Sequence, residues 1–153
     1  MTNPPAIEIV RLGRADLARM RALNELFAQA FDEPATYRAA PPDDAWLARL
    51  LASESFVALT AVEGGRIVGG LAAYALDKFE QARREIYIYD LAVAETHRRR
   101  GVATALIERL KGVARDLGAW VIFVQADYVD PPAVALYEKL GAREEVLHFD
   151  IAP

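Results

Sequence analysis

The chain has 153 residues, of which 54% are hydrophobic and 26% charged, a balance typical of one globular domain rather than a disordered segment. Its formal net charge of −4 argues against a general nucleic-acid-binding protein, which is normally basic. The absence of cysteine excludes disulfides, thiolate metal sites and a cysteine nucleophile, and the two histidines form no metal cluster with each other, so no metal is expected.

The first half of the chain alternates between strand and helix patterns. Alternating apolar and polar residues predict a strand over 6–12, and apolar residues at helical spacing predict a helix over 16–31. A polar, proline-containing connection over 32–44 leads to a short helix over 43–53, whose acidic start suits the helix dipole. Two strands around a Glu-Gly-Gly turn then predict a hairpin within 55–76.

The second half begins with a charged loop and a β-branched and aromatic strand over 85–93. A long amphipathic helix follows and is expected to stop at Gly118. The apolar run 119–127 reads as a strand covered on both faces. After a proline pair, a short helix is expected to end at Gly141, and 143–151 reads as a last strand.

The predicted order of elements, β-α-α-β-β-β-α-β-α-β, indicates an α/β domain with a mixed central sheet flanked by helices. No repeat or linker divides residues 1–153, so a single domain is expected. The start lacks a basic segment followed by a long apolar run, and no stretch approaches 18 uninterrupted apolar residues. We therefore expect no signal peptide, no membrane span and a cytoplasmic location.

Three consecutive arginines stand at the predicted start of the long helix. Helix starts carry unpaired N–H groups and a partial positive charge, and a glycine lets the preceding loop bring its amides close to an anion. Arg98, Arg99, Arg100 and Gly101 therefore predict a pyrophosphate site, with the arginines as bidentate donors. The alternative is a solvated basic turn. The spacing Arg98-x-x-Gly101-x-Ala103 fits neither the Walker pattern nor the dinucleotide-binding Gly-x-Gly-x-x-Gly.

That spacing resembles the acyl-CoA loop of the GNAT N-acyltransferase superfamily, Gln/Arg-x-x-Gly-x-Gly/Ala. The later stretch "DPPAVALYEKLGAREE" resembles the superfamily's second signature, a short helix with a tyrosine, then Leu-Gly and a final strand. The resemblance implies a GNAT fold with splayed strands that bind acetyl-CoA. The acetyl group would pass directly from the thioester to an amine, without a covalent enzyme intermediate.

A narrower resemblance covers nearly the whole chain. The segments "KFEQARREIYIYDLAVAETHRRRGVATALIERLK" and "GAWVIFVQADYVDPPAVALYEKLGAREEVLHFDI", with "IEIVRLG", "ATY" and "FVALTA", are similar to the type I aminoglycoside 3-N-acetyltransferases. These enzymes modify gentamicin and confer resistance to it. Pro131 departs from the acidic residue expected in relatives, while Asp130 beside it remains. The resemblance implies a cationic aminoglycoside as the acceptor.

The implied reaction needs one group that binds or deprotonates the amine and another that gives a proton to the CoA sulfur. Asp90 is the candidate base or ammonium anchor, and period two in its strand places it on the face of Ile86 and Ile88. A free aspartate has a pKa near 4 and is a weak base unless burial raises it. The alternative is a structural carboxylate. Tyr137 is the candidate acid for the CoA thiolate, and its alternative is simple packing at helical spacing.

The resemblance also implies where acetyl-CoA binds. The backbone of Leu91, Ala92 and Val93 would pair with the pantetheine arm, because in the superfamily this strand bulges and leaves amides free. One of these N–H groups would polarise the thioester carbonyl. An ordinary buried strand is the alternative. The remaining implied contacts to the cofactor lie at two helix starts, at Val102, Ala103, Thr104, Asp130 and Ala133.

An aminoglycoside is a polyamine at neutral pH, so its site should gather several carboxylates. The expected acceptor contacts around Asp90 are Glu80, Glu85, Asp127, Tyr128 and Asp150, with Tyr128 packing on the sugar rings. Solvated surface is the alternative for each acid. Lower in rank are the acids in or near the first helices, Asp32, Glu33, Asp43 and Asp44, and His148 is expected to be structural or at the rim.

Three alternative functions can be compared with this hypothesis. One is a GNAT enzyme that acetylates another small polyamine or a protein amine. A non-catalytic acyl-CoA module would be favoured by loss of Asp90 and Tyr137, and both are present. An RNA-binding role for Arg98–Arg100 conflicts with the acidic balance and the lack of stacking aromatics nearby. Dimers are common in the superfamily, and the strand-rich C-terminus offers an edge, which leaves a homodimer open.

Overall fold

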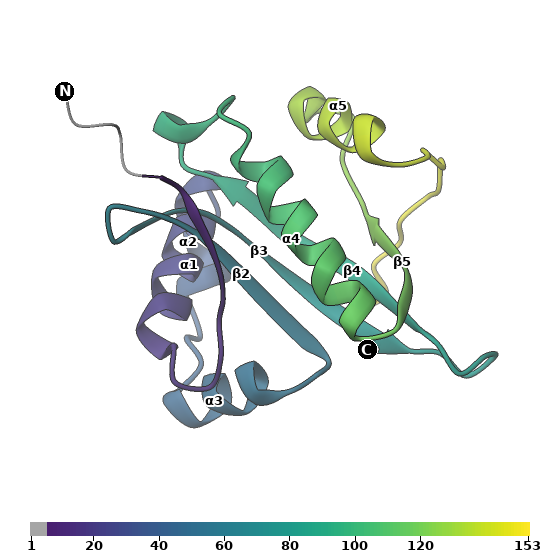
Figure 1. Cartoon of the computed structure of the whole chain (residues 1–153), viewed down its shortest axis with the longest axis horizontal. Helices are drawn as coiled ribbons and strands as arrows, with labels where there is room; N and C mark the ends of the chain where they lie inside the picture. Colours follow the sequence, from purple (N-terminus) through teal and green to yellow (C-terminus); the bar gives the residue numbers. More distant parts are fainter. Residues whose placement is uncertain (1–5) are drawn as a thin grey trace.

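A five-stranded mixed sheet, in the order β1-β2-β3-β4-β5, forms the frame of the protein in a computed structural model that describes residues 6–153 (Figure 1). Residues 1–5 of the predicted domain lie outside the described part. The first four strands pair antiparallel, and β5 pairs parallel to β4. The strands are β1 (Glu8–Arg11), β2 (Phe56–Glu63), β3 (Arg66–Asp77), β4 (Arg84–Val93) and β5 (Ala119–Val124).

Helices cover both faces of this sheet (Figure 1). They are α1 (Leu17–Ala30), α2 (Pro34–Arg38), α3 (Asp44–Ala52), the one-turn η1 (Glu95–His97), α4 (Val102–Asp116) and α5 (Pro131–Leu140). The helix α4 forms the crossover connection that the parallel strands β4 and β5 require. The single α/β domain with a mixed sheet is confirmed. The helix α2 was not predicted, because five residues are too few to show a helical period.

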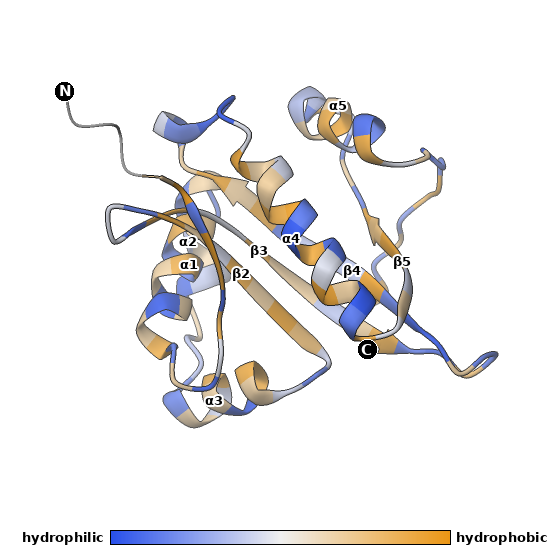
Figure 2. Ribbon diagram, in the orientation of Figure 1, coloured by the Kyte–Doolittle hydropathy of each residue, from blue (hydrophilic) through white to orange (hydrophobic). Residues whose placement is uncertain are grey.

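Two apolar cores lie on opposite faces of the sheet, where Figure 2 shows hydrophobic strands beneath the helices. The first core packs α4, through residues such as Leu106 and Leu110, against the strands. The second packs α1 and α3, through residues such as Phe27 and Leu47. Gly70 permits the close approach of α1, because a Cβ there would lie 2.4 Å from Leu23 Cδ1. The sheet is therefore buried on both faces along its centre.

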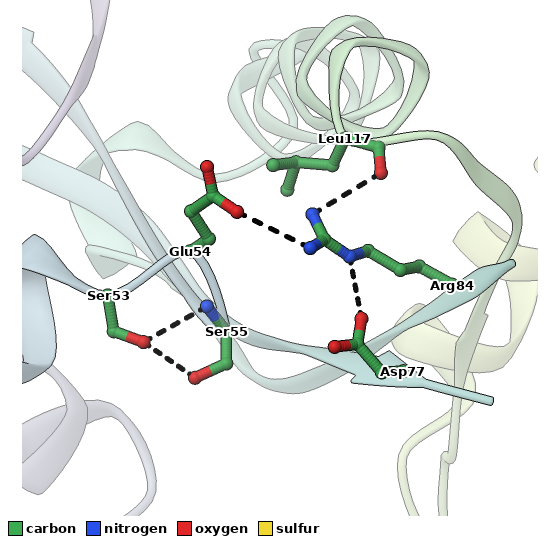
Figure 3. Close-up of polar contacts among 6 residues, drawn as sticks. All are labelled: Ser53, Glu54, Ser55, Asp77, Arg84 and Leu117. Atoms are coloured by element: carbon green, nitrogen blue, oxygen red, sulfur yellow. Dashed lines mark hydrogen bonds and ion pairs between the residues drawn. The ribbon is translucent and has the colours of Figure 1, made fainter. Parts of the chain in front are cut away.

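The start of β4 is fixed by one arginine with several partners (Figure 3). Arg84 Nε donates to Asp77 Oδ1 at 2.7 Å, and Nη2 donates to Glu54 Oε2 at 3.3 Å. Nη1 donates to the carbonyl oxygen of Leu117 at 3.5 Å. Arg84 thus joins the β3–β4 hairpin to the segment before β2 and to the end of α4.

The predicted last strand over 143–151 is wrong in this structure. No backbone hydrogen bond joins 142–153 to another described residue, and the segment is exposed throughout. Its apolar side chains stand in solvent, with Leu147 84%, Phe149 75% and Ile151 89% exposed. The segment has a strand's alternation but no strand beside it, and a strand needs a partner for its backbone groups.

The strand β5 also differs from its prediction. It ends at Val124 rather than continuing to Asp127, and it forms an edge of the sheet with half-exposed side chains. The expected cover on both faces is wrong, because none of the side chains of β5 is fully buried and Trp120 is 56% exposed. None of the described helices is long and apolar enough to cross a membrane.

Candidate active site

A β-bulge in β4 decides which way Asp90 points. Asp90 pairs with Ala72 and Ile88 pairs with Ala73, so Tyr89 is an extra residue in the ladder. Ile88 and Ala73 belong to the α4-side core, while Ala72 belongs to the core of α1 and α3. Asp90 therefore faces α1 and α2, and its predicted place on the face of Ile86 and Ile88 is wrong.

Asp90 is a half-buried carboxylate with a phenol as its hydrogen-bond partner. Tyr37 Oη, from α2, donates to Asp90 Oδ1 at 3.0 Å. Burial raises the pKa of Asp90, the hydrogen bond from Tyr37 lowers it, and the nearby charge of Glu33 raises it; the net direction is upward. Within residues 6–153, Asp90 has no ion pair with a lysine, arginine or histidine.

Further tyrosines lie near this carboxylate on β3 and β4. The ring of Tyr89 lies 5.8 Å from that of Tyr74 and 5.5 Å from that of Tyr87, edge to face in both pairs. The charge of Asp90 helps to raise the pKa of Tyr74 and Tyr87, after burial as the main cause, so both phenols stay neutral. Tyr89 is 63% exposed. Aromatic faces beside an unpaired carboxylate suit a cationic ligand, which gains from both.

The backbone edge next to Asp90 is open where β4 and β5 part. Their ladder ends at the pair Ile88–Val124, but β4 continues to Val93. From Asp90 to Val93, β4 is therefore paired with β3 alone among the described strands. The predicted cofactor edge, Leu91, Ala92 and Val93, lies on this open stretch.

The open edge leads directly to the start of α4. A Cβ at Gly69 would lie 3.1 Å from Val102 Cγ1, so this glycine lets α4 begin close against β3 and β4. Gly101 precedes the helix with φ 78°, a conformation that favours glycine. No side chain caps this helix start and its first turn has no acid, so the N–H groups of Val102, Ala103 and Thr104 are available to an anion.

The three arginines before α4 do not have equal freedom. Arg98 Nε donates to the carbonyl of Val93 at 3.1 Å, which holds the side chain against the end of β4. Arg100 Nη2 donates to Glu63 Oε1 at 2.8 Å, and His97 Nε2 lies 2.7 Å from Glu63 Oε2. These contacts lower the pKa of Glu63, with His97 as the largest cause. Arg100 therefore anchors the loop to β2, while Arg99, with φ 61°, has no such ion pair among described residues.

Tyr137 lies half-buried on α5, against the α4-side core. Burial, and secondly the charge of Asp130, raises the pKa of Tyr137 to about 12. The phenol is therefore protonated at neutral pH and is a proton donor rather than a base. The Asp130 side chain accepts a hydrogen bond from the N–H of Ala133 at 3.2 Å, so both predicted cofactor residues form the N-terminal cap of α5.

The predicted acceptor residues are not gathered in one place. Glu80 and Glu85 form ion pairs with Lys78 at 3.8 and 3.7 Å, around the start of β4. Glu85 is five residues from Asp90, about 16 Å along a strand. Asp127 and Tyr128 lie in the loop after β5, at the end where β4 and β5 separate.

Two of these residues have partners in the C-terminal segment. Arg143 lies over the ring of Tyr128, 5.5 Å from its centroid. Asp150 is 3.0 Å from His148 and is almost fully exposed. Neither contact involves Asp90. Among residues 6–153, no group of three or more His, Asp or Glu side chains is arranged to hold a metal ion.

Sequence reasoning missed most of the residues near Asp90. Tyr37 lies in a connection that was predicted as irregular, and Tyr74 and Tyr89 were placed in strands without a role. Glu33 was named only among the lower-ranked acids of the acceptor site. The one available signal was "ATY", which includes Tyr37 and belongs to the family resemblance. Contact between α2 and β4, 53 residues apart, has no local signature in the sequence.

Comparisons with known proteins agree with this geometry. The model of the acetyltransferase (GNAT) family matches residues 20–142. An aminoglycoside acetyltransferase from an uncultured soil metagenomic sample is 57% identical, with a TM-score of 0.94 over 97% of this chain and 99% of that one. A second, also from a soil metagenomic sample and solved in complex with sisomicin, is 32% identical, with a TM-score of 0.88 over 96% of each chain.

Curated relatives match over shorter regions. N-acetyltransferase family 8 member 2 of Rattus norvegicus is 28% identical over 89 residues, 58% of this chain and 39% of that protein. The chain spans less than half the length of this relative. The family model, in contrast, covers most of the chain and includes β4, the arginine loop and α5. The chain therefore belongs to the acetyltransferase (GNAT) family, whose fold uses acetyl-CoA as the acetyl donor.

Proposed function

We propose that the protein is an aminoglycoside N-acetyltransferase that acetylates the 3-amine of a gentamicin-type antibiotic and thereby confers resistance. The observation that carries the proposal is Asp90, a half-buried carboxylate with no cationic partner among the described residues, hydrogen-bonded to Tyr37 and near Tyr74 and Tyr87. Burying an unpaired charge is unfavourable unless a ligand compensates it. An ammonium group of the acceptor is such a ligand. The similarity to two aminoglycoside acetyltransferases supports this class of acceptor.

The donor would lie along the open edge of β4. Its pantetheine arm would pair with the backbone of Leu91, Ala92 and Val93, which no described strand covers on that side. Its pyrophosphate would meet the uncapped start of α4 and the guanidinium groups of Arg98 and Arg99. This arrangement fits acetyl-CoA and directs the thioester toward the end of the splay, beside Asp90.

In the chemical step, the acceptor's ammonium group first gives a proton to Asp90, directly or through a water, and the raised pKa of Asp90 makes it a better base than a free aspartate. The neutral amine nitrogen then attacks the thioester carbonyl carbon, so that a C–N bond forms and the C–S bond breaks. Tyr137 gives its proton to the leaving thiolate, for which its protonated state is suited. The nitrogen loses its second proton to solvent as the amide forms, solvent returns a proton to Tyr137, and Asp90 releases its proton with the product. A backbone N–H of β4 stabilises the carbonyl oxygen as it gains charge.

The test is acetyl transfer from acetyl-CoA to gentamicin by the purified protein, with the acetylated nitrogen located by NMR. We expect one product, acetylated on the 3-amine. Acetylation at another nitrogen would contradict the regiochemistry alone. Transfer to a simple polyamine or a peptide amine, with none to gentamicin or sisomicin, would contradict the aminoglycoside acceptor.

We further propose that the active form is a homodimer in which the C-terminal segments are exchanged. Among the described residues, one chain carries both an unpaired strand edge, on β5, and an unpaired strand-like segment with exposed Leu147, Phe149 and Ile151. Pairing the two between copies would satisfy both. Light scattering after gel filtration should give twice the mass of the chain, and removal of 142–153 should give a monomer. A monomer of the untruncated chain under the same conditions would contradict the dimer.

A further inference from the structure

We propose that Tyr37 is a positioning residue for the acceptor site: its hydroxyl holds one carboxylate oxygen of Asp90 and leaves the other for the acceptor's ammonium group. The inference rests on the proposed function, in which Asp90 serves the amine. Tyr37 touches neither reacting atom in that scheme. It acts through Asp90, and so its role has consequences that differ from those of a catalytic residue.

The position of Tyr37 is fixed by α1. Its ring centroid lies 6.1 Å from that of Phe27 and 6.2 Å from that of Phe31, both on or at the end of α1. An ion pair between Arg38 and Glu25 ties the end of α2 to α1 as well. The hydroxyl is thus delivered to Asp90 by a helix that packs on the second core. The rings remain in place when only the hydroxyl is removed.

The turn before α2 is held by a left-handed residue and a backbone hydrogen bond. Asp32 has φ 53°, a left-handed conformation that aspartate tolerates better than most side chains. The N–H of Glu33 donates to the carbonyl of Ala28 at 3.1 Å, so the chain turns tightly from α1 into α2. This turn brings Glu33, the residue before α2, and Tyr37 within it toward β4. Both side chains act on the charge of Asp90.

The groups that face Asp90 have opposite effects on it. Tyr37, from α2, stabilises the ionised carboxylate through its hydrogen bond, and Glu33, just before α2, opposes ionisation through its charge. From β3 and β4, Tyr74 and Tyr87 are neutral phenols, and neither they nor Tyr89 has a hydrogen bond to Asp90. The pH at which Asp90 becomes a base is therefore set chiefly by burial, Tyr37 and Glu33. Substitution of these two residues should therefore shift the pKa of Asp90 in opposite directions, which tests the inference.

The experiment titrates the Asp90 carboxyl by ¹³C NMR in wild type and three variants, with Asp90→Asn used for assignment. Tyr37→Phe should raise the pKa of Asp90, because the donor to the carboxylate is lost. Glu33→Gln should lower it, because a repelling charge is lost. Tyr74→Phe is the matched control: it removes a neighbouring phenol that makes no hydrogen bond to Asp90, and should leave the titration in place.

The acid limb of kcat/KM against pH should follow the titration. In Tyr37→Phe it should move to higher pH, since the enzyme needs the ionised carboxylate, and the melting temperature should change little. An unmoved Asp90 titration and acid limb in Tyr37→Phe would overturn the positioning role. Wild-type protein that acetylates no aminoglycoside would instead contradict the proposed function, and the NMR titration would still report on Tyr37.

Discussion

Each end of β4 carries a charged side chain, and the two side chains differ in how many polar partners they have. At the start of the strand, Arg84 has Asp77, Glu54 and the carbonyl of Leu117 as partners (Figure 3). Near the other end, Asp90 is half-buried with a neutral phenol as its partner and no ion pair in the described part of the chain. A charge with full compensation joins elements of the fold, whereas a charge without it is available to a ligand.

This difference separates stability from activity. Loss of Arg84 should lower the stability of the fold and change the activity little. Loss of the Asp90 charge should lower the activity without lowering the stability. The burial that raises the pKa of Asp90 means that its ionised form is disfavoured in the folded state. Its contribution to stability therefore falls as pH rises from its unfolded value through the raised folded value. At neutral pH the carboxylate works against folding, as functional charges often do.

The largest expected effect is that of Asp90→Asn on turnover. The change keeps the size and most of the hydrogen-bonding geometry but removes charge and basicity. We expect kcat/KM for an aminoglycoside to fall by about 10²-fold or more. At pH 7 the melting temperature should stay equal or rise, by the sign argued above. A variant with lower stability, and an activity loss that follows the folded fraction, would mark Asp90 as a structural brace.

Next in size is the effect of Tyr137→Phe on the chemical step. Packing against the α4-side core survives, while the proton donor to the CoA sulfur is lost. We expect kcat to fall by roughly 10²-fold, at the lower end for general acid catalysis, with CoA affinity and melting temperature unchanged. Steady-state kinetics and calorimetry with CoA measure both. Turnover at the wild-type rate would return Tyr137 to a packing role.

A smaller effect is expected from variants of the arginine loop. As in β4, the arginine that already has an ion pair should matter less for ligand binding than the one that has none among the described residues. Arg98→Ala should weaken CoA binding by about tenfold, since a hydrogen bond to a charged group contributes roughly 1.5–3 kcal/mol. Arg100→Ala should weaken it less, because Arg100 already pairs with Glu63. Calorimetry on both variants decides. Equal losses would show that Arg100 leaves Glu63 to bind the pyrophosphate, and two unchanged affinities would reject the cradle.

The smallest effect on activity is expected from Arg84→Met. The methionine keeps much of the length of the side chain but none of its polar contacts to Asp77, Glu54 and Leu117. We expect the melting temperature to fall by a few degrees and kcat/KM at 25 °C to change less than twofold. Thermal denaturation with a parallel assay checks this. A large activity loss in a folded Arg84→Met protein would break the division between the two ends of β4.

Much of the fold followed from the sequence because its main elements have strong local patterns. The period of α4, the Gly118 stop with φ 71°, and the hairpin of β2 and β3 are examples. The loop before α4 was also predicted, from the chemistry of a helix start. The family resemblance implied the opening between β4 and β5, which strand patterns alone did not show.

The remaining features depend on contacts between distant segments. The family resemblance implied a bulge in this strand, but no residue type signals that it lies at Tyr89, where it turns Asp90 to the other face. The segment 143–151 has a strand's alternation, yet pairing depends on a neighbouring edge that its own residues do not specify. The hydrogen bond from Tyr37 needs α2, which is too short to show a helical period.

The central claim is that Asp90, which has no ion pair among the described residues, has the ammonium group of the acceptor as its partner. Calorimetric titration of gentamicin into the CoA-bound protein tests this most directly, with wild type and Asp90→Asn compared at pH 7. The account predicts that gentamicin binds the variant at least about tenfold more weakly, while CoA binds both proteins equally. Equal gentamicin affinity in a folded Asp90→Asn protein would contradict it.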